Sequence, residues 1–272
     1  DVAPSRGLGD VYKRQVHIDI DRAEINKNVQ TDHHIIGDAK QVLNLLLERL
    51  PQYEHKEWKD FVLSFPRETE YGESESVLTP KQVLSAIARK CPQDSIVATD
   101  VGQHQMWAIQ HLHFDYPGQL LTSGGFGTMG FGLGAAMGAA VGNPGKVVVH
   151  CTGDGCFRMN CHELCTAEHY NIPVITVIFN NRTLGMVRQW QNLIYQKRFS
   201  QTDLDRGPDF VKLAEAYGIQ GERAATQPEF EAAFRRAVAT GRPYLIECAI
   251  DKDAMVHPMV SAGAPVADFI LD

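Results

Sequence analysis

The chain has 272 residues, of which 44 % are hydrophobic and 22 % are charged, and its formal net charge is −7. Such proportions are typical of a globular protein that buries a sizeable core without disulfide bonds. The negative charge argues against non-specific binding to nucleic acid, which needs a basic surface, and no apolar run reaches the roughly 20 residues of a membrane-spanning helix. We therefore expect no nucleic-acid partner and no membrane segment.

Six cysteines occur along the chain, and four of them fall between residues 151 and 165. No secretory signal is recognisable before them, so free thiols in a reducing compartment are expected. The cysteines therefore favour a cytoplasmic location.

The front of the chain predicts two different segments. Residues 1–15 (DVAPSRGLGDVYKRQ) show no apolar periodicity, so we expect a non-native leader there and a native chain that is cut at its front. Residues 16–21 alternate apolar and acidic side chains as a strand does, an apolar pair follows at 35–36, and leucines recur at helical spacing over 39–50. Residues 16–52 are therefore predicted to be the C-terminal remnant of a second α/β domain.

A polar, aromatic stretch at 53–78, with some helix at 58–63, is predicted to be a linker. From residue 79 to residue 272 apolar runs alternate with helical patterns. Helices are expected at 80–90, 101–112, 126–141, 160–170, 208–217 and 229–240, and strands at 95–99, 146–151, 174–179 and 244–250. This alternation predicts an α/β fold with a doubly wound, mainly parallel sheet and helices on both faces.

The sharpest polar pattern is Gly153-Asp154-Gly155, directly after one expected strand, with Asn181 at the end of the next strand, 27 positions beyond Asp154. Carboxyl ends of parallel strands meet at one sheet edge, where open α/β folds bind ligands. A carboxylate and an amide oxygen suit Mg²⁺, which proteins often share with phosphates, and the glycines let backbone N–H groups approach a diphosphate. Residues 182–185 are expected to form a loop that can complete the coordination. Either motif alone is also what a plain turn or a helix cap selects.

Gly-Asp-Gly followed after about thirty residues by Asn-Asn resembles the signature of thiamine-diphosphate-dependent enzymes. The wider sequence, from about residue 16 to the end, resembles more narrowly the catalytic large subunit of the acetolactate synthase family. The stretches that carry this resemblance are TDVGQHQMW (99–107), LTSGGFGTMGFGL (121–133), GMVRQW (185–190), VHIDIDRAEI (16–25) and IIGDAK (35–40).

The resemblance implies a role for each matching residue. The thiamine diphosphate contacts that it implies are Gly102, Gln103, His104, Gly127, Met129, Gly153, Asp154, Gly155, Cys156, Asn181, Met186 and Val187, with Met129 bending the cofactor into a V shape. The Mg²⁺ ligands that it implies are Asp154, Asn181 and the carbonyl of Thr183. It places Trp190 at a substrate channel and Asp19, Ile20, Asp38 and Ala39 at FAD.

Each of these roles has a plainer structural alternative. His104 is also compatible with a surface or helix-capping histidine, Met129 and Met186 with ordinary core methionines, and Trp190 with packing. Asp19 and Asp38 are also what strand-end caps require.

For function, the resemblance implies decarboxylation of pyruvate and transfer of the hydroxyethyl unit to a second pyruvate or 2-oxobutyrate, in branched-chain amino-acid biosynthesis. It implies a homodimer or tetramer of catalytic subunits and allows a small regulatory subunit. The glutamate that activates the cofactor belongs to an N-terminal domain in this family, and no segment here resembles that domain. We therefore expect a fragment that is inactive alone, which acetolactate formation by the isolated chain would contradict.

Two kinds of alternative remain open. One is another thiamine-diphosphate carboligase or decarboxylase of the glyoxylate carboligase type. The other is a non-catalytic module on the same fold, although such a module is expected to have a damaged metal site.

Two further patterns are interpreted as structural. Residues 125–130 fit G-x-G-x-x-G, but they lack the long preceding strand and the later acidic residue of a dinucleotide fingerprint. Cys156, Cys161, His162 and Cys165 lack the second ligand pair of a structural zinc site, so they are expected to be buried thiols on a helix face.

Overall fold

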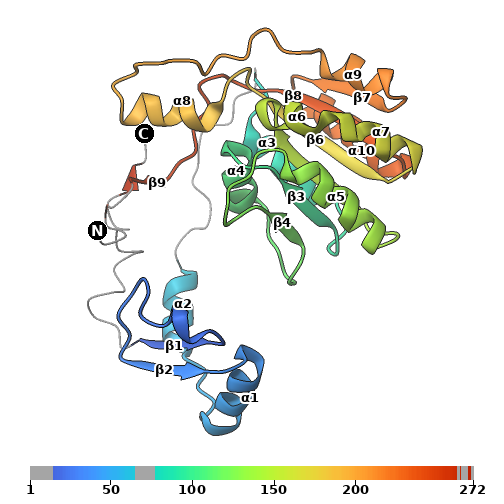
Figure 1. Cartoon of the computed structure of the whole chain (residues 1–272). Helices are drawn as coiled ribbons and strands as arrows, with labels where there is room; N and C mark the ends of the chain where they lie inside the picture. The colour runs from blue at the N-terminus through green and yellow to red at the C-terminus, as the bar shows by residue number, and fades with distance from the viewer. Residues whose placement is uncertain (1–14, 65–76, 262–263, 265–268, 271–272) are drawn as a thin grey trace. The chain divides into compact units, whose positions relative to one another are not determined.

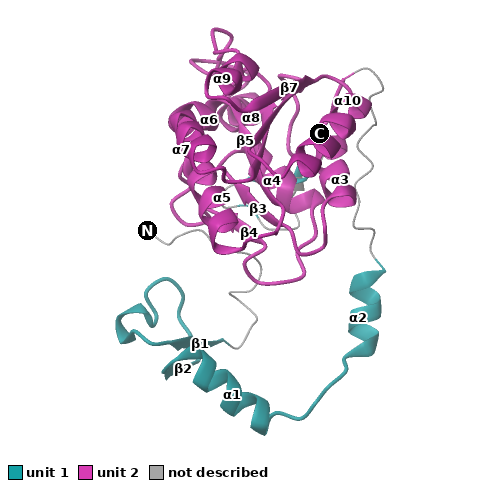
Figure 2. Cartoon of the chain, turned by 90° about the vertical axis from the view of Figure 1, so that its right-hand side faces the viewer, with its two compact units in different colours: residues 1–71, 257–272 teal, residues 72–256 magenta. Residues whose placement is uncertain are grey.

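The structure is a computed structural model, and it describes residues 15–64, 77–261, 264 and 269–270. The chain divides into two compact units, residues 1–71 with 257–272 and residues 72–256 (Figure 2). The predicted leader lies outside the described residues except for Gln15. The boundaries of the non-native leader (1–15), the domain remnant (16–52) and the linker (53–78) remain predictions.

The first unit contains a two-stranded parallel sheet in which β1 pairs with β2. Its described elements are β1 (Val16–Asp19), the 3-10 turn η1 (Arg22–Glu24), β2 (His33–Ile36), α1 (Ala39–Arg49), α2 (Lys56–Leu63) and the antiparallel pair β9 (Met259–Val260) and β10 (Phe269–Ile270). The strand, helical turn, strand and helix from β1 to α1 confirm the predicted order of elements for residues 16–50.

The second unit is built on a six-stranded parallel sheet with the order β4-β3-β5-β6-β8-β7 (Figure 1). Its strands are β3 (Ile96–Thr99), β4 (Leu120–Thr122), β5 (Val148–Gly153), β6 (Val174–Asn180), β7 (Gln220–Ala224) and β8 (Tyr244–Ala249). Its helices are α3 (Pro80–Lys90), α4 (Gln103–His111), α5 (Phe131–Gly142), α6 (Asp154–Asn160), the 3-10 turn η2 (Cys161–Glu163), α7 (Leu164–His169), α8 (Gly185–Leu193), α9 (Phe210–Ala216) and α10 (Gln227–Thr240).

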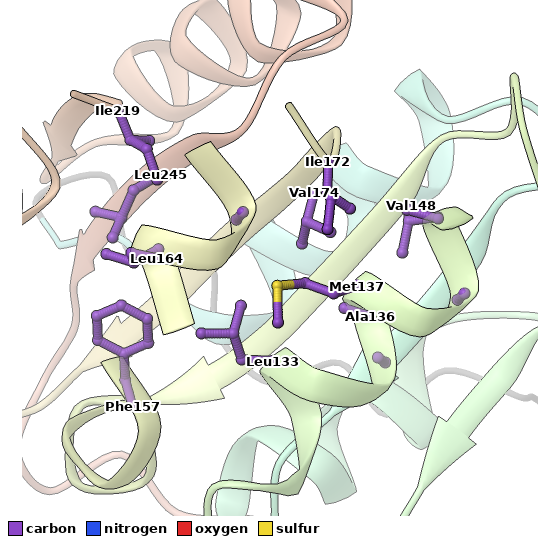
Figure 3. Close-up of a cluster of buried hydrophobic side chains, with 14 of the residues drawn as sticks. Leu133, Ala136, Met137, Val148, Phe157, Leu164, Ile172, Val174, Ile219 and Leu245 are labelled. Carbon is purple, nitrogen blue, oxygen red and sulfur yellow. The ribbon is translucent and has the colours of Figure 1, made fainter. Parts of the chain in front are cut away.

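Helices cover both faces of this sheet, which confirms the predicted fold class. On one face, side chains from α5, α6, α7 and α9 form a single apolar cluster with alternate strand residues such as Ile96, Ala98 and Val148 (Figure 3). On the other face, Trp107 of α4 packs against Phe179 of β6 with ring centroids 6.3 Å apart. Because successive side chains of a strand point to opposite faces of the sheet, each side chain packs against the helices on the face to which it points.

Several element limits differ from the prediction for identifiable reasons. The glycine-rich helix begins at Phe131 rather than at 126, because Gly127 and Gly130 adopt positive φ of 67° and 87°. The helix expected at 160–170 begins earlier, at Asp154, and a 3-10 turn interrupts it. The loop expected at 182–185 ends at Gly185, where the unpredicted helix α8 begins.

Strand β7 was not predicted, because its sequence Gln-Gly-Glu-Arg-Ala lacks an apolar run and lies at the edge of the sheet. None of the helices in the described ranges is long and apolar enough to span a membrane. The six cysteines are free thiols: Cys151, Cys156 and Cys248 are buried, whereas Cys91 and Cys161 are half-buried and Cys165 is exposed. The expectation that the thiols at 161 and 165 are buried is therefore wrong.

Candidate functional site

A pocket lies at the carboxyl ends of β3, β5 and β6, where the strand order reverses direction. The chain leaves β3 towards β4 on one side and leaves β5 towards β6 on the other, and such switch points are the usual ligand sites of open α/β sheets. The pocket is lined by Val101, Gly102, Gln103, His104, Trp107, Met129, Gly153, Asp154, Gly155, Cys156, Phe179, Asn181, Thr183, Leu184, Gly185, Met186 and Val187. Four segments that are far apart in the sequence (101–107, 129, 153–156 and 179–187) thus meet at the carboxyl ends of the strands.

Two glycines allow polar side chains to approach the pocket closely. A Cβ at Gly153 would stand 3.0 Å from His104 Nδ1. A Cβ at Gly185 would stand 2.0 Å from Gln103 Oε1 and 2.7 Å from Asn181 Nδ2, and real contacts are never that short. The glycine-containing motifs are therefore required by close packing around the pocket.

Asp154 is a buried carboxylate in the wall of the pocket. It is the first residue of α6, is 1 % exposed, and its Oδ2 atom has no hydrogen-bond partner. Burial raises the pKa of its carboxyl to about 6, against a lowering effect of Arg158, whose Nη2 is 3.9 Å away. A buried carboxylate oxygen without a partner is costly unless a cation compensates its charge.

Asn181 and Thr183 are buried in the same pocket. The backbone N–H of Thr183 donates to Asn181 Oδ1 at 3.2 Å, and the Thr183 hydroxyl donates to the Thr202 carbonyl at 2.9 Å. The amide of Asn181 donates to Gln103 Oε1 at 3.3 Å. These bonds fix the loop after β6 beside Asp154.

The residues fit a hard divalent cation. Asp154 supplies an unsatisfied carboxylate oxygen, and Asn181 and Thr183 bring amide and backbone carbonyl oxygens, the ligand type that Mg²⁺ prefers. Within the described ranges no cluster of three or more His, Cys, Asp and Glu side chains could hold a metal.

Gln103 lies in the pocket wall, but its amide already has three partners. Its Nε2 donates to Gln189 Oε1 and to the Ala254 carbonyl, each at 2.8 Å, and its Oε1 accepts from Asn181. Gln189 in turn exchanges two 2.9 Å bonds with the backbone of Val256. In this structure Gln103 thus ties the Asn181 loop to α8 and to the segment after β8.

His104 is 5 % exposed, and its Nε2 has no hydrogen-bond partner. Burial lowers the pKa of its imidazole to about 4, against a raising effect of the Asp100 charge. The ring is therefore neutral near pH 7, beside Gly153 at the edge of the pocket.

This burial predicts a pH-dependent contribution to stability. Because the pKa of His104 is near 6.5 in the unfolded chain and about 4 in the fold, its contribution is present above pH 6.5 and is lost as the pH falls towards 4. Relative to the native chain, His104→Gln should therefore gain about 2 kcal/mol between pH 7 and pH 5. Urea unfolding of both proteins at the two pH values measures this change, and a difference independent of pH would contradict it.

The remaining predicted cofactor residues divide into two groups. Met129, Cys156, Met186 and Val187 line the pocket, so Met129 and Met186 are not ordinary core methionines. Gly127 is exposed and does not line the pocket, and neither does Trp190, which lies half-buried on α8.

The sequence analysis gave no role to Val101, Trp107 and Phe179, which complete the lining together with Leu184 and Gly185 of the loop expected at 182–185. Each lies within three residues of a residue that was named. The strand ends and the turns that follow them therefore marked the correct regions of the sequence, but the prediction named too few residues in each region.

The residues predicted to contact FAD lie in the first unit, at the carboxyl ends of β1 and β2. Asp19 Oδ1 accepts from the backbone of Asp21 at 2.8 Å, and Asp38 caps α1 by accepting from Gln41 N at 3.0 Å. Ile20 is exposed and Ala39 begins α1. The structure thus brings the four residues to one edge, and it also satisfies the plainer alternative that both aspartates are caps.

The sequence of this chain is similar to those of known proteins. Residues 100–248 match the family described as "Thiamine pyrophosphate enzyme, C-terminal TPP binding domain". The chain is 43 % identical to the "Probable acetolactate synthase large subunit" of Methanocaldococcus jannaschii, over 94 % of this chain and 45 % of that protein. It is 40 % identical both to the acetolactate synthase isozyme 2 large subunit of Escherichia coli (94 % and 46 %) and to the mitochondrial acetolactate synthase catalytic subunit of Saccharomyces cerevisiae (98 % and 39 %).

The chain spans less than half the length of each of these relatives. The family match covers the whole pocket, from Val101 to Val187. The chain therefore belongs to the thiamine pyrophosphate enzymes and contains their C-terminal thiamine-pyrophosphate-binding domain.

Proposed function

We propose that this chain supplies the diphosphate and metal half of an acetolactate synthase active site. The observation that carries the proposal is the buried Asp154 carboxylate, whose Oδ2 lacks a hydrogen-bond partner and which lines the same pocket as Asn181 and Thr183. The 40–43 % identity to acetolactate synthase large subunits supports this enzyme over other members of the family.

Different pocket residues would hold different parts of the cofactor. Asp154, Asn181 and the Thr183 carbonyl would bind Mg²⁺, and the backbone at Gly153, Gly155 and Gly102 would approach the diphosphate. Met129, Met186 and Val187 would contact the organic part. When bound, thiamine diphosphate supplies the electron sink for decarboxylation of a 2-keto acid.

This chain's own contribution would be to orient the cofactor and exclude water. Met129, Val187 and Phe179 line the pocket with apolar side chains, and Asp154 adds a buried carboxylate to the same lining. A low-polarity wall beside a fixed charge strengthens electrostatic interactions inside the pocket. The proposed reaction is decarboxylation of pyruvate followed by condensation with a second pyruvate or 2-oxobutyrate.

Further parts of the proposal concern the whole protein. We propose a homodimer or tetramer of catalytic subunits, with room for a small regulatory subunit, working in branched-chain amino-acid biosynthesis. The edge carrying Asp19, Ile20, Asp38 and Ala39 would contact FAD. Free thiols support a reducing compartment, and we propose the cytoplasm.

A chimera tests the reaction directly. Residues 16–272 would replace the matching segment of the E. coli isozyme 2 large subunit, and acetolactate formation from pyruvate would be measured with Mg²⁺ and thiamine diphosphate. We expect activity, and we expect Asp154→Ala in the same chimera to remove it because the cation loses its only carboxylate ligand.

The product distinguishes this proposal from its alternatives. Condensation of glyoxylate without acetolactate would favour the glyoxylate carboligase type, and acetaldehyde alone would favour a decarboxylase. A chimera that binds the cofactor but forms none of these products would favour the non-catalytic module.

A further inference from the structure

A buried polar network lies under the pocket, on the sheet face that α5 covers. Asp100, His150, Thr152 and Thr176 are each at most 1 % exposed, and they come from the end of β3, from β5 and from β6. His150 Nε2 and the Thr152 hydroxyl lie 3.0 and 2.6 Å from Asp100 Oδ2, and Thr176 Oγ1 lies 3.5 Å from His150 Nδ1. Strands of a parallel sheet covered on both faces are normally apolar here.

Such a network needs a reason, because a buried ion pair is often less stabilising than apolar residues of the same shape. Burial alone would raise the pKa of Asp100, but His150, the Thr152 hydroxyl and the Gly132 amide hold this pKa well below its usual range. Asp100 is therefore a carboxylate at neutral pH that accepts hydrogen bonds on both oxygens. The network thus holds one negative charge at a fixed place in the fold, with fixed hydrogen-bond geometry.

The second carboxylate oxygen of Asp100 reaches the segment that carries Met129. The backbone N–H of Gly132, in the first turn of α5, donates to Asp100 Oδ1 at 2.8 Å. No side chain fits at this position, because a Cβ would stand 2.6 Å from His150 Nε2 and 2.8 Å from Asp100 N. Asn160 holds the same turn from the other side by donating to the Gly130 carbonyl at 2.7 Å.

Asp100 also begins the segment that forms the opposite wall of the pocket. Val101, Gly102 and His104 follow it directly and line the pocket. One carboxylate thus connects the His104 segment (residues 101–104) to the Met129 loop (residues 123–132). Thr152, which also donates to Asp100, directly precedes Gly153 of the Asp154 turn, whereas the Asn181 loop is held by bonds to Gln103 and Thr202.

We propose that Asp100 and His150 are positioning residues that hold the Met129 loop at a fixed distance from the His104 segment and so shape the place for the organic part of the cofactor. This inference rests on the proposed function. To the metal and diphosphate contacts proposed above, which include Gly102, it adds a role for the buried Asp100 network in placing Met129 against the organic part of the cofactor.

Hydrogen–deuterium exchange of the cofactor-free chain tests the network by itself. Asp100→Ala removes the acceptor, and we expect exchange about tenfold faster in residues 123–132 than in the native chain, because local opening reports local stability. Asp100→Asn keeps an oxygen for Gly132 N–H and should restore most of the protection. Glu222→Gln is the matched control: this carboxylate also pairs with a cation and a hydroxyl, of Arg236 and Tyr244, but it lies in β7 at the far edge of the sheet.

If Asp100→Ala does not fold, His150→Ala takes its place, since it leaves Thr152 and Gly132 bonded to Asp100 and should give a smaller increase in the same loop. Faster exchange spread evenly over the sheet, or no change in residues 123–132, would overturn the proposal.

Titration with two ligands tests the consequence for the cofactor. With Mg²⁺ present, Asp100→Ala should bind thiamine diphosphate about 10- to 100-fold more weakly, as loss of supporting contacts usually does, but inorganic diphosphate should lose less than about threefold. Equal losses for both ligands would mean a merely structural role and contradict the assignment. A native chain that binds neither ligand would contradict the proposed function instead, while the exchange experiment would still decide the role of Asp100.

Discussion

Replacing Asp154 with Asn should stabilise the metal-free chain while abolishing Mg²⁺-dependent binding of thiamine diphosphate. The pKa of Asp154 is about 6 in the fold because its carboxyl is buried, and it is near 3.8 when the chain is unfolded. Keeping this charge buried at pH 7 therefore costs about 3 kcal/mol, which the neutral amide does not incur. In the proposed site, the lost carboxylate is also the only charged ligand for the cation.

The size of the effect depends on pH. Because the folded state holds the proton more tightly, the contribution of Asp154 to stability is fully present below pH 3.8 and is lost as the pH rises through 6. The gain of Asp154→Asn should therefore be complete above pH 6 and absent near pH 4. Urea unfolding in EDTA at pH 7.5 and pH 4 measures both values.

Glu222→Gln provides a control of opposite sign. The hydrogen bond from Arg236 holds the pKa of Glu222 below its usual range, so removing this charge should destabilise the chain. A destabilised Asp154→Asn protein at pH 7.5 would show that the buried carboxylate has a partner of its own and is not kept for a cation.

Replacing Gly185 with Ala should disrupt the site by steric conflict. The new Cβ would stand 2.0 Å from Gln103 Oε1, and the Gln103 amide is tied to Gln189 and Ala254, so it has little freedom to move away. We expect a loss of about 1–3 kcal/mol in the free energy of unfolding, as for other overpacked sites. Displacement of Asn181 should weaken cofactor binding about 10- to 100-fold.

Gly138→Ala is the matched control for this substitution. Gly138 lies inside α5, and a Cβ there would meet nothing within 4 Å. Alanine is the better helix former, so stability should rise by about 0.5–1 kcal/mol. Calorimetric melting and cofactor titration of both variants check the pair, and an unchanged affinity in Gly185→Ala would contradict the packing around Gln103.

That Asp154 and Asn181 meet in one pocket was predictable because the signals are local. Apolar runs marked β5 and β6, and the glycines and the Asn-Asn pair that follow them can only lie at the carboxyl edge of a parallel sheet. The carboxylate of Asp154 and the amide oxygen of Asn181, which are ligands of the type that Mg²⁺ prefers, then predicted a magnesium site. The same logic explains why the fold class was predicted correctly.

The missed features depend on contacts between distant segments. That His150 and Thr152 face α5 and meet Asp100 follows from sheet register, which no local pattern contains. Gln103 lines the pocket, and no local pattern shows that its amide is also tied to Asn181, Gln189 and Ala254, more than 75 positions away. Strand β7 lacks an apolar run because it is an edge strand.

Isothermal titration of the 272-residue chain with thiamine diphosphate, with Mg²⁺ and with EDTA, tests the central claim most directly. We predict saturable one-site binding that requires Mg²⁺ and is abolished by Asp154→Ala, while Glu222→Gln binds as the native chain does. Binding that is independent of Mg²⁺, or that Asp154→Ala leaves unchanged, would contradict the assignment of this pocket as the metal and diphosphate site.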